Sequence, residues 1–281
     1  MSKWRIVVDS SVDFQATELS LEDVDMKIVP LQIVVGNQIF VDDENLDVME
    51  LLKKMDEEKE GSKTACPSPG QFLECYRGAE NVLCFTITGS LSGTYNSAVL
   101  ASAMAKEEQE TMNNYVLDSH SNAGHLALLV KKAATLIQQE LSFEEICQEL
   151  ETYNQEIQIM AILGNFDNLV KTGRMNPIVG GIADTLSIKA IVQNTHEGQI
   201  MPIKKARGFK GAYKKLVDTI FSVDRDLEGC PMYISHCNNE QGALKVKELI
   251  VEKGKHNPIY ITTCKGLTTF YAMDQGIIVG F

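Results

Sequence analysis

Three apolar, strand-like segments in the first half of the chain each end in a run of small polar residues. They are WRIVVDSS (4–11), NVLCFTITGSLSG (81–93) and NNYVLDSH (113–120), and helix-like segments follow at 98–110 and 124–140. Strands that alternate with helices predict a parallel sheet with helices on its faces. Ligands of such sheets bind at the carboxyl ends of the strands, so the polar runs mark the predicted ligand-binding edge.

The pattern changes after residue 156. Strand-like segments now alternate less regularly with two helices, 209–223 and 240–254, and HEGQ (196–199) is typical of a hairpin turn. This half predicts a mixed α+β unit. At about 150 residues per domain, a chain of 281 residues is expected to form two domains, here residues 1–156 and 157–281.

The composition excludes several classes of partner. The net charge is −12 and the pI about 4.9, which argues against binding to nucleic acid or to an anionic membrane surface. Residues 81–105 lack charge but are rich in Ser, Thr, Asn and Gly, so we expect no stable membrane insertion. The seven cysteines are scattered without a CxxC pair, and the start of the chain lacks an apolar signal core. Both features favour reduced thiols and a cytoplasmic location.

The segment TGSLSGTYNSA (88–98) concentrates hydroxyl groups at a strand-to-helix corner. The free N–H groups of a helix N-terminus favour an anion, and hydroxyl groups add donors without adding a counter-charge. In the simplest alternative, Ser90 or Ser92 is only the N-cap of the helix. One cap needs one hydroxyl, whereas the corner has several, and Gly89 and Gly93 allow a ligand to approach the backbone. We therefore predict an anion site here.

Other chemistries have weaker support. Ser92 does not lie in a GxSxG arrangement, and the five histidines are scattered, so no base is paired with it. Walker and GxGxxG motifs are absent, and no spacing indicates a metal; we expect no cofactor. The run Asp9-Ser10-Ser11-Val12-Asp13 could serve a phosphoaspartate or metal site, but a helix cap and turn is the preferred interpretation.

Two basic features stand out on an acidic chain. Arg174 follows Gly173, a predicted helix C-cap, and Arg207 lies close to Lys204 and Lys205. Each is either a solvated surface or a site that attracts a phosphate or an acidic partner.

Seven spaced segments together resemble the bacterial DegV family. They are VVDSS, KTACPSPGQF, LSGTYNSA, VLDS followed by GHLALLV, NLVKTGRM and the final GIIVGF, in order over essentially the whole chain. The resemblance implies a Rossmann-like N-terminal α/β domain and a second α/β domain with a mixed sheet. A fatty acid tail would lie in a tunnel between or within them. It also implies that the protein is the binding subunit of a fatty acid kinase, which presents its ligand to a separate kinase subunit.

The same resemblance supplies candidate site residues. The family binds the carboxylate with a Thr, the Ser of LSGTY and a C-terminal His; these positions correspond to Thr64, Ser92 and Tyr271, with Gly93 beside Ser92. Tyr271 departs from the family because its hydroxyl can donate a hydrogen bond but has no positive charge near neutral pH. Cys66 likewise replaces a family Gln. Two arginines implicated in kinase docking or phosphoryl transfer correspond to Arg174 and Arg207.

The sequence therefore predicts a non-catalytic protein that binds a long-chain fatty acid for a kinase subunit. Two alternatives stay open. One is an enzyme, either a lipid hydrolase that uses Ser92 or an acyl-transferring enzyme. The other is a binding module for a different anionic lipid or a phosphometabolite.

Overall fold

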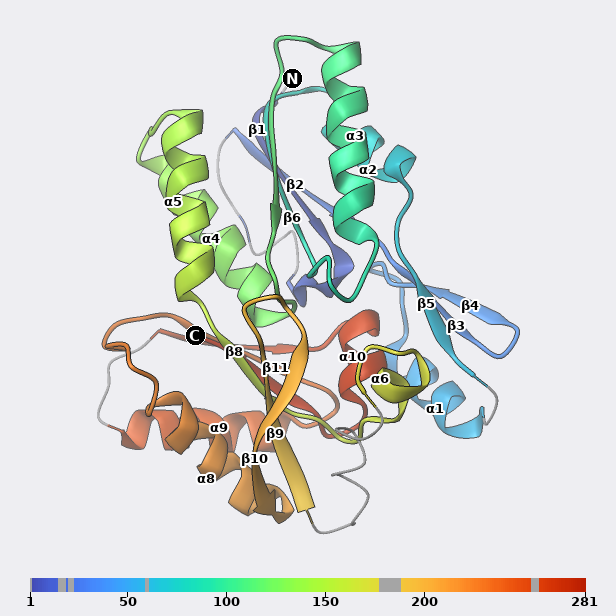
Figure 1. The fold of residues 1–281 in the computed structure, drawn as a ribbon, viewed down its shortest axis with the longest axis vertical. Helices are drawn as coiled ribbons and strands as arrows, with labels where there is room; N and C mark the ends of the chain where they lie inside the picture. Colours follow the sequence, from blue (N-terminus) through green and yellow to red (C-terminus); the bar gives the residue numbers. More distant parts are fainter. Residues whose placement is uncertain (1, 15–18, 20–22, 59–60, 177–187, 254–257) are drawn as a thin grey trace.

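The computed structural model describes the chain except residues 1, 15–18, 20–22, 59–60, 177–187 and 254–257. Two sheets, one above the other in Figure 1, organise the molecule, and a small third sheet lies beside their junction. The first sheet forms within residues 1–156 and the second within 157–281.

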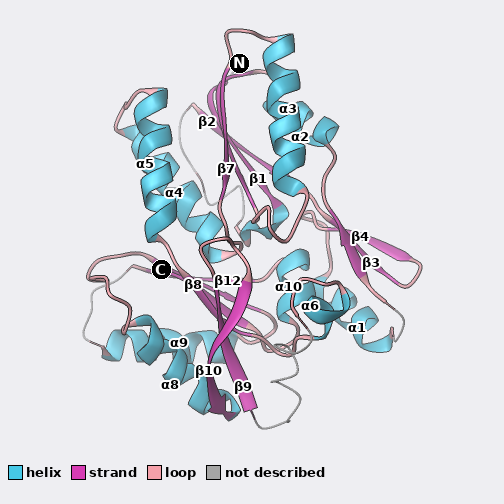
Figure 2. Cartoon of the chain, viewed as in Figure 1, coloured by secondary structure: helices cyan, strands magenta, loops and turns pink. Residues whose placement is uncertain are grey.

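The first sheet has four parallel strands in the order β2-β1-β6-β7, as the sequence predicted. Helices cover both of its faces, as Figure 2 shows. The strands are β1 (Ser2–Asp9), β2 (Val24–Val29), β6 (Ala79–Thr86) and β7 (Asn113–Asp118). The helices are α2 (Pro69–Tyr76), α3 (Thr94–Glu108), α4 (Gly124–Gln138) and α5 (Phe143–Glu156).

The side chains of β1 explain why helices cover both faces of the first sheet. Ile6 and Val8 are fully buried against α4 and α5, whereas Val7 is buried against α2 and α3. Successive residues of a strand point to opposite faces, so a strand that is apolar at every position needs helices on both sides.

The second sheet is mixed and has six strands in the order β10-β9-β8-β13-β11-β12. Only β11 and β12 pair in parallel; the other neighbours are antiparallel. The strands are β8 (Ile159–Ile162), β9 (Ile188–Asn194), β10 (Ile200–Arg207), β11 (Met232–His236), β12 (Ile259–Thr263) and β13 (Ile277–Gly280). Helices α8 (Gly208–Ile220) and α9 (Glu240–Glu252) cover its outer face. Residue 254, the expected end of the second helix, lies outside the described residues.

The third sheet is antiparallel, with the order β4-β3-β5. Its apolar face packs against one helix from each half of the chain, through Leu51 of the first and Phe270 of the second. The elements are β3 (Gln32–Val35), β4 (Gln38–Val41), β5 (Lys63–Ala65), α1 (Val48–Glu57) and α10 (Gly266–Ala272). Because α10 packs on both α1 and β3, the two halves of the chain interlock here.

The local predictions mostly agree with the structure. In the sequence, Ser142 with Glu145 three residues later predicts a capping box, and Pro69 suits a first helical turn; the box is present in α5, and Pro69 occupies the first turn of α2. Two elements differ. The two prolines of segment 63–77 predict a loop that leads into a helix, but the segment begins with β5, and no local pattern predicted α10. Both are short, and their stability comes from tertiary pairing and packing that local patterns do not encode.

No helix within the described parts of the chain is both long and apolar enough to span a bilayer.

Candidate functional site

The carboxyl ends of β1, β6 and β7 meet at one edge of the first sheet, as predicted. Asp9, at the end of β1, accepts hydrogen bonds from the backbone N–H groups of Ser11 (2.9 Å) and Ile87 (2.6 Å). The N–H of Ser119 donates to the carbonyl of Thr86 at 3.2 Å. The three polar runs are therefore joined into one network. Asp9 caps the short 3-10 helix η1 (Ser10–Val12), which agrees with the preferred interpretation of this run as a cap and turn.

One half of the hydroxyl corner already binds an anion from the protein itself. The N–H of Gly89 donates to Asp118 Oδ2 at 2.9 Å, and the N–H of Thr88 donates to the carbonyl of Ser121 at 2.9 Å. The hydroxyls of Thr88 and Ser90 bond to each other at 3.0 Å. This half of the corner is structural.

The other half of the corner presents the half-buried hydroxyl of Ser92 beside the buried hydroxyl of Thr94. Ser92 Oγ lies 2.8 Å from Thr94 Oγ1 and accepts a bond from the N–H of Thr94 at 3.3 Å. Gly93 holds the N-cap position of α3 and makes no side-chain cap bond, but Ser92, one residue earlier, bonds the first N–H of the helix, which is part of what the simple capping alternative requires of it. Ser92 still keeps hydroxyl capacity for a ligand.

Thr64 and Tyr271 meet although 207 positions separate them. Thr64 Oγ1 of β5 and the Tyr271 hydroxyl of α10 lie 3.0 Å apart. β5 also approaches the corner, because a Cβ atom added at Gly93 would lie 3.3 Å from Cys66 Sγ. The fold thus brings three of the predicted carboxylate-binding positions, Thr64, Gly93 and Tyr271, to one region, with Ser92 adjacent to Gly93.

An apolar cavity extends from Tyr271 over the inner face of the second sheet. Its lining is mostly aliphatic, with Ile159, Leu163 and Ile278 among the residues, which suits an alkyl chain. Its floor follows β8 from Ile159 through Ala161 to Leu163, a rise of about 13 Å at about 3.3 Å per residue. The Leu163 end lies next to Tyr271, because the N–H of Gly164 donates to the carbonyl of Ala272 at 2.7 Å.

Of the two predicted basic sites, one lies at the corner. Arg174 follows α6 (Asp167–Lys171), and its Nε donates to the carbonyl of Leu91 at 3.2 Å. Its Nη1 donates to the carbonyl of Thr172 at 2.5 Å. The expected C-cap Gly173 has a φ of +74°, the left-handed conformation that such a position favours. Arg174 is half-buried rather than standing at an exposed turn, since two carbonyls hold its guanidinium.

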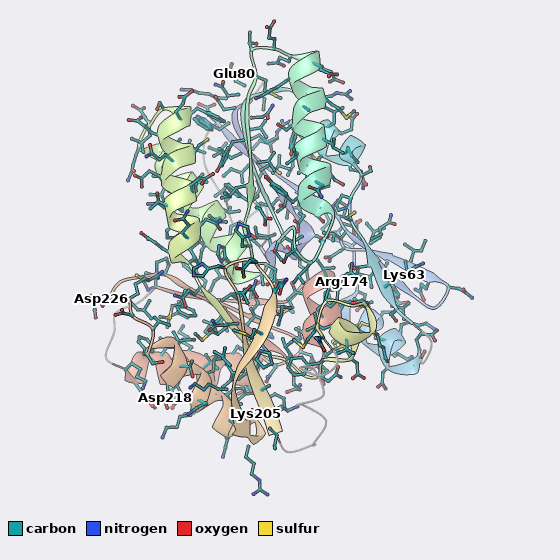
Figure 3. The ribbon with its side chains drawn as sticks, viewed as in Figure 1. Lys63, Glu80, Arg174, Lys205, Asp218 and Asp226 are labelled. Carbon is teal, nitrogen blue, oxygen red and sulfur yellow. The ribbon has the colours of Figure 1, made fainter. Side chains whose placement is uncertain are left out.

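The second basic site lies elsewhere. Arg207 is exposed at the end of β10, where it pairs with Ile188 of β9. Lys205, two residues before it, and Arg174 lie in well-separated parts of Figure 3. No contact links Arg207 to the corner within the described residues.

The structure also buries three carboxyl groups where the two halves of the chain meet. Desolvation raises the pKa of Asp9 to about 6 and that of Asp13 to about 7, and it also raises the pKa of Asp42. Asp13 accepts from the N–H of Lys265 at 2.7 Å. Asp42 accepts from the N–H groups at the start of α10, those of Gly266 (2.7 Å) and Leu267 (2.9 Å).

The role of Asp42 was missed from the sequence. Its only local signal is its place directly after a strand, which does not distinguish a buried acid from a turn residue. The metal alternative for Asp9 and Asp13 gains no support, since no group of three or more ligating side chains occurs within the described residues.

The contacts of Ser92 do not favour a nucleophile. Its hydroxyl bonds to Thr94. A catalytic serine instead needs a hydrogen bond to an adjacent base. Two buried histidines are engaged elsewhere. His125 Nε2 bonds to Asn154 at 2.8 Å, and His236 Nδ1 accepts from the N–H of Asn239 at 3.3 Å.

Comparison with known proteins identifies relatives that cover the whole chain. The family model described as "Uncharacterised protein, DegV family" matches residues 3–275. A DegV domain-containing protein of Streptococcus gordonii is 36% identical over 278 residues, which are 99% of this chain and 98% of that protein.

Two solved structures show the same fold. One is the fatty acid kinase B3 protein of Streptococcus pneumoniae loaded with linoleic acid; it is 34% identical, with a TM-score of 0.96 and 99% of each chain covered. The other is a DegV family protein of Eubacterium eligens loaded with heptadecanoic acid; it is 31% identical, with a TM-score of 0.92, and 99% of this chain and 98% of that chain are covered.

Proposed function

The chain belongs to the DegV family, and from that premise we propose that it binds a long-chain fatty acid and presents it to a separate kinase subunit. The carboxylate is held by Thr64, Ser92 and Tyr271, with Gly93 leaving room beside them. The observation on which the proposal rests is the 3.0 Å contact of the Thr64 and Tyr271 hydroxyls at the mouth of the apolar cavity.

The chemistry of the site suits this ligand. A carboxylate leaves water only if hydrogen bonds replace its hydration, and neutral hydroxyl groups supply donors without a charged partner. The tail gains about 0.8 kcal/mol for each CH₂ group buried in the cavity. Affinity then comes mostly from the tail, and orientation comes from the hydroxyls.

Tyr271 takes the place of the family's His without disrupting the arrangement. Its hydroxyl reaches Thr64, and its ring packs edge-on against Phe270 with the centroids 4.8 Å apart. A tyrosine fixed by such packing presents one donor in a defined direction. We propose that it replaces the imidazole as a neutral donor to the carboxylate.

The proposal divides the chain by task. Residues 1–156 bear the carboxylate-binding loops, and residues 157–281 close the acyl tunnel, with Tyr271 as their contribution to the head-group site. The kinase subunit docks near Arg174, which is joined to the corner through Leu91, and Arg207 contributes a second basic contact. All seven cysteines are free, in line with a reducing cytoplasm as the place of action.

The first test is mass spectrometry of an organic extract of the purified protein, with native mass spectrometry alongside. The expected result is one long-chain fatty acid per chain. An extract without fatty acid, from a protein that also fails to take up added fatty acid, would contradict the proposal.

The second test compares Ser92→Ala with Ser97→Ala by isothermal titration with hexadecanoic acid. Ser97 belongs to the same 88–98 segment but lies inside α3, one turn after its N-cap, and serves as the matched control. Loss of one donor is expected to weaken binding by up to about tenfold with the control unchanged. Equal binding by all three proteins would remove Ser92 from the site.

A further inference from the structure

Ile159 stands at the end of the acyl cavity that lies farthest from Tyr271. The cavity floor follows β8, and its Leu163 end lies next to Tyr271, since the N–H of Gly164 donates to the carbonyl of Ala272 at 2.7 Å. Ile159 begins the strand at the opposite end. A fatty acid whose carboxylate bonds to Tyr271 therefore points its methyl end at Ile159.

The side chain of Ile159 lies on the cavity side of the second sheet. Ile159 and Ala161 belong to the apolar cluster of the inner face, whereas Met160 and Ile162 are buried in the cluster of the outer face. This agrees with the alternation of side chains along a strand. Ile159 lines both the cavity and a separate polar cleft, so it forms part of the wall between the two spaces.

On one side of Ile159 the wall is closed by backbone. Ile159 pairs with Gly280 of β13. A Cβ atom added at Gly280 would lie 2.7 Å from the carbonyl carbon of Gly124, and one added at Gly124 would lie 2.8 Å from the carbonyl oxygen of Tyr233. The start of α4 is thus in direct contact with the sheet here, and it leaves no space for a methylene group.

On the other side of Ile159 the wall is closed by a polar group. Gln193 pairs with Met160, which places Asn194 of β9 beside Ile159. Asn194 Nδ2 donates to the carbonyl of His120 at 3.0 Å, a bond between the two halves of the chain. A tail that displaced this amide would break the bond without replacing it, which costs free energy. The methyl end therefore meets the side chain of Ile159.

The space behind Ile159 offers a longer tail no gain. The cleft there is lined by His120, His196 and Glu197. Methylene groups that passed the wall would leave an apolar lining for a polar one, so burying them would contribute little. The free energy of binding should stop improving with chain length at the point where the tail touches Ile159.

We propose that Ile159 determines the specificity for acyl chain length. Its side chain stops the methyl end, and its size sets the longest straight chain that the protein binds with full affinity. The inference rests on the proposed function, because it takes the carboxylate to lie at Thr64 and Tyr271. It adds a limit on chain length to the substrate class of that site.

The test is a competition experiment on the delipidated full-length protein. Straight-chain saturated acids of even length, from tetradecanoic to docosanoic acid, are added in equal amounts, and native mass spectrometry gives the bound fraction of each. Each additional buried CH₂ group is expected to raise binding about fourfold until the tail reaches Ile159. The wild-type profile should therefore rise to an optimum length and then level off or fall.

Substitutions at Ile159 should move that optimum in both directions. Ile159→Ala shortens the side chain at the wall and is expected to admit about two more CH₂ groups. The acid two carbons longer than the wild-type optimum should then gain about tenfold relative to the optimum acid. Ile159→Phe extends the wall into the cavity and should move the optimum toward shorter chains. A general loss of packing does not predict opposite shifts from one position.

Ile162→Ala is the matched control. It removes the same atoms from the same strand, but on the outer face, where Ile162 is fully buried. The length profile should keep its wild-type optimum although the protein loses stability. The milder pair Ile159→Val and Ile162→Val gives the same contrast at a smaller cost in folding, and only the first of the two should favour longer chains.

The outcomes separate the two proposals. If the wild-type protein binds these acids but the variants of Ile159 keep its optimum length, the inference is overturned and the proposed function stands. Equal shifts in the Ile159 and Ile162 variants also overturn it, because looser packing of the whole sheet would then be the cause. If none of the acids binds to the wild-type protein, the proposed function fails, and the inference with it.

Discussion

The two faces of the second sheet, formed by the same strands, differ in how they are packed. On the outer face, large side chains such as Ile162 and Ile234 are fully buried under α8 and α9. On the inner face, some of the buried positions are small residues such as Ala161 and Ala190. Ala161 lines the apolar cavity. Dense packing of large side chains on the outer face gives stability. Space left between small side chains on the inner face is available to a ligand.

The inner face is also the more polar of the two. Asp13 lies beside the hydroxyls of Ser235 and Thr268, and Thr268 lines the cavity. Buried polar groups next to a cavity cost folding free energy. The inner face is therefore expected to contribute less stability than the outer face. Four predictions test this contrast.

The largest effect is expected on the outer face. Ile234→Ala removes a fully buried side chain and should lower the free energy of unfolding by about 2–5 kcal/mol, measured by chemical denaturation. Ile278→Ala, which lines the cavity on the inner face, should cost less because the side chain already borders empty space. Equal losses of unfolding free energy in the two variants would show that the two faces are packed equally well.

The second prediction concerns pH and the buried carboxyls. Asp9 and Asp13 have folded-state pKa values of about 6 and about 7, raised by burial, so the folded protein holds their protons more tightly than the unfolded chain. The stability that this contributes is complete below the unfolded pKa and is lost as the pH rises through the folded values. From about pH 5 to about pH 8 the free energy of unfolding should fall by an amount on the order of 4 kcal/mol, at about 1.4 kcal/mol per pH unit for each carboxyl below its folded pKa.

Asp13→Asn should flatten that pH dependence, measured by denaturation at a series of pH values. The control is Asp218→Asn. Asp218 is exposed and bonded to Lys253, which lowers its pKa, so it should not change the slope in this range. A wild-type protein that becomes more stable from about pH 5 to about pH 8 would contradict the assignment.

The third prediction fills the cavity. Ala161→Phe places a ring over the middle of the cavity floor and should weaken fatty acid binding by at least about tenfold, measured by titration calorimetry. Its cost in stability should be smaller than that of Ile234→Ala, since the ring enters existing space. Leu244→Phe on the exposed side of α9 is the control. Unchanged binding by Ala161→Phe would place the tail elsewhere.

The smallest effect is expected at the head group. Tyr271→Phe removes the hydroxyl that contacts Thr64 and should weaken fatty acid binding by about threefold to tenfold. Thr64→Ala should act on the same hydrogen bond, so the double variant should lose less than the two single losses combined. Strictly additive losses would show that the two hydroxyls act independently.

The sequence predicted the elements whose signals are local. Continuous apolar runs predicted the parallel strands, and Ser142 with Glu145 marked the start of α5. The elements that it did not predict depend on distant partners. β5 has only three residues and exists because it pairs with β3, and α10 is fixed by packing on α1 and by Asp42.

For the site, the motif resemblance proposed Thr64, Ser92 and Tyr271, but it could not separate the two halves of the hydroxyl corner. In the sequence, nothing distinguishes the hydroxyls of Thr88, Ser90 and Ser92 as possible ligand donors. In the structure, Thr88 and Gly89 are engaged by Ser121 and Asp118, from a segment about thirty residues further along the chain. Only Ser92 remains beside Gly93 and the Thr64 strand.

By itself, the sequence determined which segments form strands and helices, that polar side chains gather at the ends of the parallel strands, and which family the chain resembles. Those features depend on periodicity, capping and turn chemistry, which act over a few residues. Only the tertiary structure decided which hydroxyls are already bonded and where the cavity runs. Those properties depend on which groups meet across the fold, and the free energy of a buried polar group is set by its partners.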